Sequence, residues 1–315
     1  MNKNDKVFIA GHQGMIGSAL VRYLKTNGFQ KAITTGIDLT DQPGIFDFMK
    51  AERPDYVFLT GARTGGIVAN SRYPAEFIYQ NLQVQNNIIH SAWRYGVKKL
   101  LFFASSCIYP RECHQPMKEE YLLTGKLEPT SEPYAIAKIA GIRMCQSYNL
   151  QYGTRFISAV PADVYGPEDD FNEETGHVLP ALLAKMHDAK KGGRSAVTVW
   201  GTGSPRREAL YVDDLADASV FLMNQYDKSE IINIGSGQDF SVKELAERIR
   251  SAVGYQGEII YDVSKPDGAP RKLLDNGRIT GLGWTPRVSP DAGIRQTYQW
   301  YLAHIIDKSN VEIQR

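Results

Sequence analysis

Two short segments of the sequence bring together residue types that can move a proton. Ser105 and Cys107 follow an apolar run, and Tyr134 precedes Lys138 by four positions. Positions i and i+4 share one face of a helix, so the Lys138 ammonium is expected close to the Tyr134 phenol. A nearby cation favours the phenolate, so we expect the pair to exchange a proton near neutral pH. With Ser105 holding a carbonyl oxygen by a hydrogen bond, these residues predict protonation of that oxygen during a carbonyl reduction.

The Tyr-x-x-x-Lys spacing alone is weak evidence for a catalytic pair, because two common residues often fall at helical spacing by chance. Its context is stronger. An apolar run over residues 6–10 leads into Gly11-x-x-Gly14-x-x-Gly17, and helical spacing follows over residues 18–24. Between a strand and a helix, glycines allow a tight turn and let backbone amides approach a pyrophosphate at the positive helix end. The turn therefore predicts a bound dinucleotide, with a purely structural loop as the alternative.

Strands and helices alternate through the first half of the chain. Apolar runs at residues 55–59, 100–104 and 156–160 predict buried strands, and helical stretches over residues 77–95 and 134–152 lie between or after them. We expect an α/β fold with a doubly wound parallel Rossmann sheet and a smaller, mostly C-terminal α/β substrate domain. Ligands should gather outside the carboxyl ends of the strands, where Gly11, Ser105 and Pro161 fall.

Length and composition agree with this division. The 315 residues suit a dinucleotide-binding domain over 1–165, to which segments around 208–235 return, and a mainly substrate-binding part over 166–315. Lysine and arginine total 36 against 35 acidic residues, so nothing indicates a nucleic-acid surface. Neither a membrane-spanning run nor a signal-peptide pattern is evident. Cys107, Cys113 and Cys145 form neither a disulfide framework nor a metal motif, which favours the cytoplasm.

Longer strings of sequence carry a resemblance to a known family. Residues 8–12, 65–70, 73–81, 105–110, 132–141 and 265–268 resemble the GDP-L-fucose synthase family of extended short-chain dehydrogenases/reductases, nearly end to end. The spacing of the three glycines is also that of extended short-chain enzymes. The resemblance implies NADPH-dependent 3,5-epimerisation and 4-reduction of a GDP-4-keto-6-deoxy-hexose to GDP-L-fucose or a closely related GDP-deoxy sugar.

Catalytic roles follow from the resemblance: Ser105, Tyr134 and Lys138 for reduction, and Cys107 and His177 for epimerisation. A 4-keto group acidifies the hydrogens at C3 and C5, so a thiolate can remove one proton while an acid returns another on the opposite face. Histidine suits the acid because it titrates near neutral pH. The alternatives are that Cys107 is a small buried apolar residue and that His177 is an ordinary loop histidine.

The resemblance also implies binding residues. The implied cofactor contacts are Gly11, Gln13, Gly14, Met15, Ile16, Gly17, Asp38, Ser105, Tyr134, Lys138, Pro161, Ala162, Asp163, Val164 and His177. The implied substrate contacts are Lys185, Trp200, Arg207 and Asp267, with the Arg207 guanidinium able to grip a diphosphate. Trp200 has the alternative of a core position on a strand, and Asp267 that of a turn residue.

Three places in the sequence depart from the family pattern. Asp163 stands where the family commonly has Asn, so its carboxylate needs a cationic partner or a proton beside a diphosphate. Thr34, Thr35 and Gly36 stand where bacterial relatives often have arginines for the NADPH 2′-phosphate. NADP(H) is therefore favoured while NAD(H) stays open. Ala209 replaces a Phe, which would enlarge a pocket and admit a different sugar.

Rival functions make different demands on the sequence. A nucleotide-sugar 4-epimerase with tightly bound NAD has no need for Cys107, and a 4,6-dehydratase should carry an Asp-Glu pair where Ser106 and Cys107 stand. A non-catalytic dinucleotide-sensing protein generally loses the catalytic Tyr or Lys. We also expect a homodimer, because the helices over 77–95 and 134–152 carry apolar residues on more than one face and relatives pair such helices. The residues in question are Ile88, Ile89, Trp93, Ile139, Ile142 and Met144.

Overall fold

The computed structural model describes residues 1–173, 175–265 and 267–307, and its largest sheet has six parallel strands. Their order is β2-β1-β3-β4-β5-β9. The strands are β1 (Lys6–Ala10), β2 (Lys31–Ile33), β3 (Tyr56–Leu59), β4 (Lys99–Phe103), β5 (Phe156–Pro161) and β9 (Ile232–Ile234). Every residue of β4 and β5 is buried, as expected for a parallel sheet covered on both faces.

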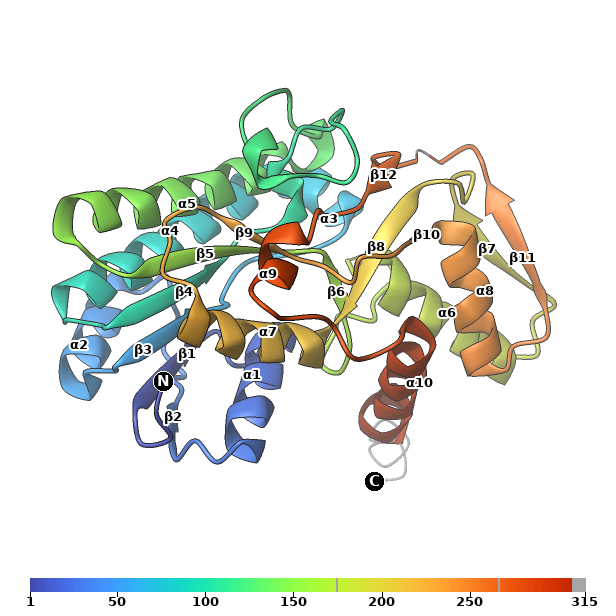
Figure 1. Cartoon of the computed structure of the whole chain (residues 1–315). Coiled ribbons are helices and arrows are strands. Elements are labelled where there is room, and N and C mark those ends of the chain that lie inside the picture. The colour runs from blue at the N-terminus through green and yellow to red at the C-terminus, as the bar shows by residue number, and fades with distance from the viewer. Residues whose placement is uncertain (174, 266, 308–315) are drawn as a thin grey trace.

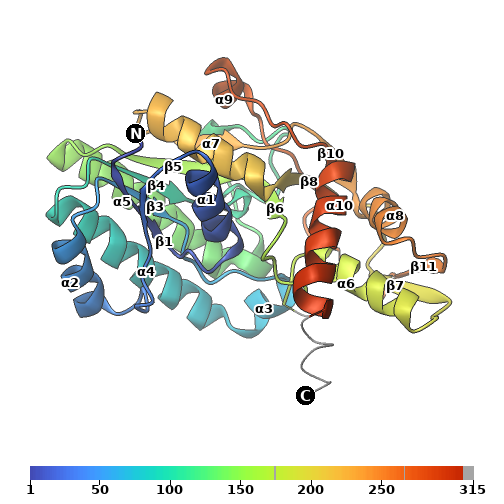
Figure 2. The ribbon, with the colours of Figure 1, turned by 90° about the horizontal axis from the view of Figure 1, so that it is seen from below.

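Helices cover both faces of this sheet (Figures 1 and 2). On one face α4 packs against both α2 and α5, and on the other α1 packs against α7. These helices are α1 (Met15–Thr26), α2 (Gln42–Glu52), α4 (Pro74–Arg94), α5 (Glu132–Tyr152) and α7 (Val212–Gln225). The predicted doubly wound parallel fold is confirmed.

The second part of the chain builds smaller sheets around β8. This strand pairs with β6 and β12 in parallel and with β10 in the antiparallel sense, while β7 and β11 form a separate parallel pair. A second hydrophobic core lies among α6, α8 and α10, on the right of Figure 1. The strands are β6 (Asp163–Tyr165), β7 (Ala196–Trp200), β8 (Arg206–Tyr211), β10 (Asp239–Ser241), β11 (Glu258–Asp262) and β12 (Arg271–Lys272). The remaining helices of the chain are α3 (Ile67–Arg72), α6 (Val178–Lys191), α8 (Val242–Val253), α9 (Gly277–Gly281) and α10 (Pro290–Tyr301), of which α3 belongs to the first half. A π-helical turn follows at Leu302–Ile306.

Two buried charged residues tie distant segments together. Lys99 is 1% exposed, and its Nζ donates to the carbonyl oxygens of Leu222 and Met223 at 3.1 and 2.9 Å and pairs with Asp227 at 2.8 Å. This cation satisfies carbonyls in the last turn of α7. Glu208, also 1% exposed, accepts the N–H groups of Gly237 and Leu274 at 2.7 and 2.8 Å. Burial raises the pKa of Glu208 to about 7.

The apolar residues expected at a dimer interface are mostly buried inside the chain. Ile88, Ile89 and Ile142 have no exposed surface and Ile139 is also buried, so packing within the domain already accounts for them. Other apolar residues on α4 and α5 stay exposed, namely Tyr79, Ile136, Leu150 and Tyr152. Within the described residues, no helix has both the length and the apolar character to cross a membrane.

Candidate active site

Two of the three glycines in the turn after β1 have no room for a side chain. Gly11 has φ of +104°, and a Cβ there would lie 2.4 Å from the Gly61 nitrogen. A Cβ on Gly17 would lie 2.1 Å from the Gly11 carbonyl oxygen. Gly14 precedes α1 and leaves its first amides without a side-chain cap, so Met15 and Ile16 begin the helix with free N–H groups. This arrangement fits a pyrophosphate at the positive end of α1.

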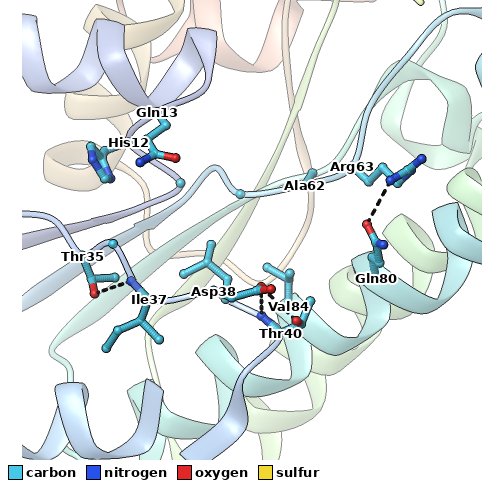
Figure 3. A pocket seen from close by; sticks show the side chains of 14 residues that line it. His12, Gln13, Thr35, Ile37, Asp38, Thr40, Ala62, Arg63, Gln80 and Val84 are labelled. Carbon is cyan, nitrogen blue, oxygen red and sulfur yellow. Dashed lines mark hydrogen bonds between the residues drawn. The ribbon is translucent and has the colours of Figure 1, made fainter. Parts of the chain in front are cut away.

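A pocket of about 470 Å³ adjoins the turn, where the strand order reverses at β1 (Figure 3). Asp38 lies in its wall, and the Thr40 N–H and hydroxyl, at 2.9 and 2.8 Å from the carboxylate, lower the Asp38 pKa. The pocket lies at the topological switch point of the sheet and suits the adenosine half of a dinucleotide. It is lined by Gly11, His12, Gln13, Thr35, Gly36, Ile37, Asp38, Leu39, Thr40, Gly61, Ala62, Arg63, Gln80 and Val84.

Sequence reasoning missed several pocket residues. His12 and Arg63 are the lining residues that can carry positive charge, and the Arg63 guanidinium pairs with Glu76 at 2.8 Å. Both follow the carboxyl ends of predicted strands, which is the signal that marks them. The second strand of the chain, β2, ends at Ile33. After Ile33 the chain leaves the sheet, so Thr35 and Gly36 form part of the pocket wall.

The structure places the predicted reduction residues around the end of β4. Ser105 precedes a single 3-10 turn (Ser106–Ile108), and its Oγ accepts the Cys107 N–H at 3.4 Å. Tyr134 and Lys138 lie near the start of α5 and are 9% and 4% exposed. Lys138 Nζ donates to the Phe103 carbonyl oxygen at 2.9 Å and lies 5.7 Å from the centre of the Tyr134 ring. Burial lowers the pKa of Lys138 to about 7.

The expectation that the Tyr134 phenolate would be favoured is wrong. Burial raises the pKa of Tyr134 above its ordinary value, and Cys107 adds to this, while a hydrogen bond with Ser105 acts in the opposite direction. The physical reason is that desolvation penalises the anion, and the Lys138 ammonium is directed to the Phe103 carbonyl. Tyr134 therefore keeps its proton at neutral pH, which is the form that can donate to a carbonyl oxygen.

Cys107 has a partner that the sequence did not reveal. The Lys272 ammonium donates to Cys107 Sγ at 3.4 Å, from strand β12 and 165 residues further along the chain. Cys107 is only partly buried, so its interpretation as a wholly buried apolar residue is wrong. That description fits Cys145, which has no exposed surface and whose pKa burial raises to about 12. Within the described ranges, no group of three or more His, Cys, Asp or Glu residues is placed to hold a metal ion.

Asp163 has the cationic partner that its departure from the family pattern required. It pairs with Ala209 in register between β6 and β8, and its Oδ2 lies 3.9 Å from Arg207 Nε. His177 stands immediately before α6 and is exposed. Protein atoms packed around its ring lower the His177 pKa, an effect that Asp163 opposes and Lys272 strengthens. Asp163, His177, Lys272 and Arg207 therefore belong to one cluster of charged and titratable groups.

Pro161, Ala162 and Val164, which are also expected cofactor contacts, lie at or just after the end of β5. Pro161 ends that strand, the N–H of Ala162 donates to the Ile234 carbonyl at 2.9 Å, and Val164 pairs with Leu210. They connect the large sheet to β8, which carries Arg207.

The predicted substrate residues lie on several segments. Trp200 ends β7 and is 51% exposed, so the alternative of a core tryptophan is wrong. Asp267 accepts the Thr202 N–H and hydroxyl at 3.0 and 2.7 Å. A Cβ on Gly268 would lie 2.8 Å from Arg207 Nη2, so the loop after Asp267 reaches Arg207. Lys185 pairs with Glu173 at 3.3 Å.

Comparisons with known proteins agree with this architecture. A relative from Arabidopsis thaliana named putative GDP-L-fucose synthase 2 is 52% identical over 98% of this chain and 95% of its own. A solved GDP-6-OMe-4-keto-L-xylo-heptose reductase from C. jejuni superposes with a TM-score of 0.92 at 38% identity, covering 96% of this chain and 99% of that one. MlghC, a GDP-mannoheptose C4 reductase from Campylobacter jejuni with NADP bound, gives 0.87 at 41% identity over 96% and 99%.

The family assignment rests on both the matched residues and the relatives. The model of the NAD dependent epimerase/dehydratase family matches residues 7–235, which include the glycine turn, Ser105, Cys107, Tyr134 and Lys138. About half of all positions are identical to the plant relative along nearly the whole chain. The chain therefore belongs to the NAD dependent epimerase/dehydratase family, within the group of GDP-L-fucose synthases.

Proposed function

We propose that the protein catalyses NADPH-dependent 3,5-epimerisation and 4-reduction of a GDP-4-keto-6-deoxy-hexose, giving GDP-L-fucose or a closely related GDP-deoxy sugar. The observation that carries the proposal is the turn after β4. There a thiol in contact with a lysine stands two residues from Ser105, which lies close enough to the Tyr134 phenol to influence its pKa. One site thus holds a base for carbon acids and an acid for a carbonyl oxygen.

Epimerisation uses Cys107 and His177. The 4-keto group of the substrate acidifies the hydrogens at C3 and C5, and the Cys107 thiolate takes one of these protons, which leaves an enolate. His177 returns a proton to the same carbon from the other face, and the centre is inverted. His177 then regains a proton and Cys107 loses one, so no net proton is consumed. The assignment is supported by the position of Lys272, which contacts Cys107 Sγ at 3.4 Å and also influences the His177 ring.

Reduction uses Ser105, Tyr134 and Lys138. When held at the glycine turn, NADPH would supply a hydride to C4. The Tyr134 hydroxyl gives its proton to O4, and its raised pKa keeps that proton available. Ser105 hydrogen-bonds O4. Lys138 Nζ lies 5.7 Å from the centre of the phenol ring and donates to the Phe103 carbonyl.

Binding of the two nucleotides is divided between the two parts of the chain. In this proposal residues 1–165, with the segments around 208–235, hold NADP(H) through the glycine turn, Asp38 and residues 161–164, and residues 166–315 hold the GDP-sugar. Lys185, Trp200, Arg207 and Asp267 contact the GDP moiety. We place the reaction in the cytoplasm, where the free thiols of Cys107, Cys113 and Cys145 stay reduced.

Assay with NADPH and a panel of GDP- and UDP-linked 4-keto sugars tests the proposal. Cys107→Ser should abolish solvent deuterium incorporation at C3 and C5 while NADPH binding persists. Tyr134→Phe should retain that incorporation and lose NADPH oxidation. Cys113→Ser, which removes a partly buried thiol from another loop, serves as the control and should change neither. Turnover of UDP-sugars in preference to GDP-sugars, or undiminished deuterium uptake by Cys107→Ser, would contradict the proposal.

We also propose that the protein is a homodimer in which α4 and α5 pair with the same helices of a second copy. Support comes from the apolar residues left exposed on these helices: Tyr79 is 65% exposed, Ile136 43% and Leu150 91%. In a two-fold symmetric interface these residues would be buried on both copies of the chain. Sedimentation at micromolar concentration should show a species of twice the 35.2 kDa chain. Leu150→Asp should weaken it, and a species of single-chain mass alone would rule the dimer out.

A further inference from the structure

Lys272 is held in a fixed position next to Cys107. Strand β12, which consists of Arg271 and Lys272, pairs in parallel with β8 at Arg206 and Arg207. Two residues later the Leu274 N–H donates to the buried Glu208 carboxylate at 2.8 Å. The strand is thus fixed on both sides of Lys272. The 3.4 Å contact between Lys272 Nζ and Cys107 Sγ follows from the fold of the smaller sheet rather than from a mobile surface side chain.

The charges around Lys272 favour its ammonium form. Burial alone lowers its pKa and Arg207 acts in the same sense, but Cys107 and Asp163 raise the pKa more strongly, so that the net change is upward. Other titratable groups also approach the thiol. Tyr134 on α5 responds to charge on Cys107, and His177, before α6, responds to Lys272 and Asp163. Of these groups, Lys272 is the one whose cation directly contacts the sulfur.

We propose that Lys272 is a positioning residue that holds Cys107 as a thiolate through a direct contact between ammonium and sulfur, so that the base for epimerisation is ready before the sugar binds. The inference rests on the proposed function and names the group that prepares its base. During the reaction Lys272 keeps its proton. The C3 or C5 proton passes to sulfur, and the negative charge moves from sulfur to the enolate oxygen.

Alkylation by iodoacetamide measures the thiolate without substrate or cofactor. The whole protein is treated at a series of pH values, and peptide mass spectrometry follows Cys107 and Cys113 separately. Cys113 is a reference within the same chain, because burial raises its pKa. In the unaltered protein Cys107 should react faster than Cys113 at pH 7. Lys272→Met should move the midpoint of the Cys107 profile upward by about one pH unit and slow the alkylation of Cys107 at neutral pH.

Two variants separate charge from structure. Lys272→Arg keeps the cation and should retain a Cys107 profile close to that of the unaltered protein. Arg271→Met removes one positive charge from the same strand, but its guanidinium pairs with Asp239 and not with Cys107. It should leave the Cys107 profile in place. A merely structural role for β12 would make Arg271→Met and Lys272→Arg behave like Lys272→Met.

The proposal is overturned if Lys272→Met shifts the Cys107 profile no more than Arg271→Met does, or if Cys107 in the unaltered protein reacts no faster than Cys113 at pH 7. The solvent-deuterium assay keeps this result apart from the proposed function. A lysine-dependent thiolate that catalyses no exchange at C3 and C5 would support the present inference and refute the proposed epimerisation. Conversely, solvent-deuterium exchange at C3 and C5 that persists in Lys272→Met, together with an unshifted Cys107 alkylation profile, would support the proposed epimerisation and refute the present inference.

Discussion

Replacing Asp163 by Asn tests how its carboxylate affects the nucleotide site. Asp163 Oδ2 lies 3.9 Å from Arg207 Nε, and the two side chains are 39% and 14% exposed. Unit charges at this distance attract each other by about 1 kcal/mol in water and about 4 kcal/mol at an effective dielectric constant near 20. Because solvent reaches Asp163, the lower value applies.

Removing the carboxylate frees Arg207 for a diphosphate and removes a repulsion between like charges. We therefore expect GDP to bind about fivefold more tightly to Asp163→Asn, which corresponds to about 1 kcal/mol. Calorimetric titration with GDP measures this directly. The gain should shrink at high salt, since exposed charges are screened over about 10 Å at 0.1 M ionic strength.

Asp213→Asn is the matched control, because the Asp213 carboxylate pairs with Arg22 at 3.0 Å on α7 and α1. In an Arg207→Met background the Asp163→Asn change should give a smaller gain, because only the repulsion between the carboxylate and the diphosphate is then relieved. Unchanged affinity in the single variant would mean that Asp163 does not face the diphosphate. Markedly weaker binding would mean that Asp163 itself contacts the ligand. Either result would refute the reasoning.

Three further predictions concern stability, pH and the glycine turn. Lys99→Met should lower the free energy of unfolding in urea by about 3 kcal/mol, because buried carbonyls of α7 lose a charged donor. Lys98→Met, at the exposed neighbouring position, is the control and should change that free energy little. Burial raises the pKa of Glu208 to about 7 from 4.5. Its contribution to stability is therefore complete below the lower value and lost as the pH rises through the upper one. In Glu208→Gln the melting temperature should fall less steeply with pH over this range than in the unaltered protein. Gly14→Ala should keep the melting temperature, since its Cβ would meet nothing nearer than 3.8 Å, and weaken NADPH binding in a fluorescence titration, whereas Gly17→Ala should lower the melting temperature because its Cβ would lie 2.1 Å from a carbonyl oxygen.

Local pattern predicted the large sheet well where strands are continuous apolar runs. β1 has the predicted bounds, β3 and β5 differ from the prediction by one residue at one end, and β4 differs by one residue at each end. The agreement follows because burial on both faces demands apolar side chains throughout. β6, β9, β10 and β12 contain two or three residues each, which is too short for a periodic signal. The smaller sheets around β8 could therefore not be worked out from pattern.

Site residues that lie close together in the sequence could be predicted, whereas a residue that reaches the site from a distant segment could not. Ser105 and Cys107 belong to one turn, and Tyr134 and Lys138 to one helix face, so short motifs identified them. Lys272 reaches Cys107 through the pairing of β12 with β8, and no local spacing encodes that contact. The Tyr134 pKa depends on how deeply α5 packs against the sheet, which residue types alone do not reveal.

The place of β9 in the large sheet has a consequence for synthesis of the chain. One edge of β5 pairs with β4, and the other pairs with Ile232–Ile234. While the ribosome translates the more than sixty residues between these strands, the apolar β5 has an unpaired edge, and α7, which covers one face of the sheet, is also incomplete. Open edges of apolar strands are sites of association between chains. In this interval the open edge of β5 is a site where nascent chains can associate, and a chaperone bound there would prevent it until residue 234 has emerged.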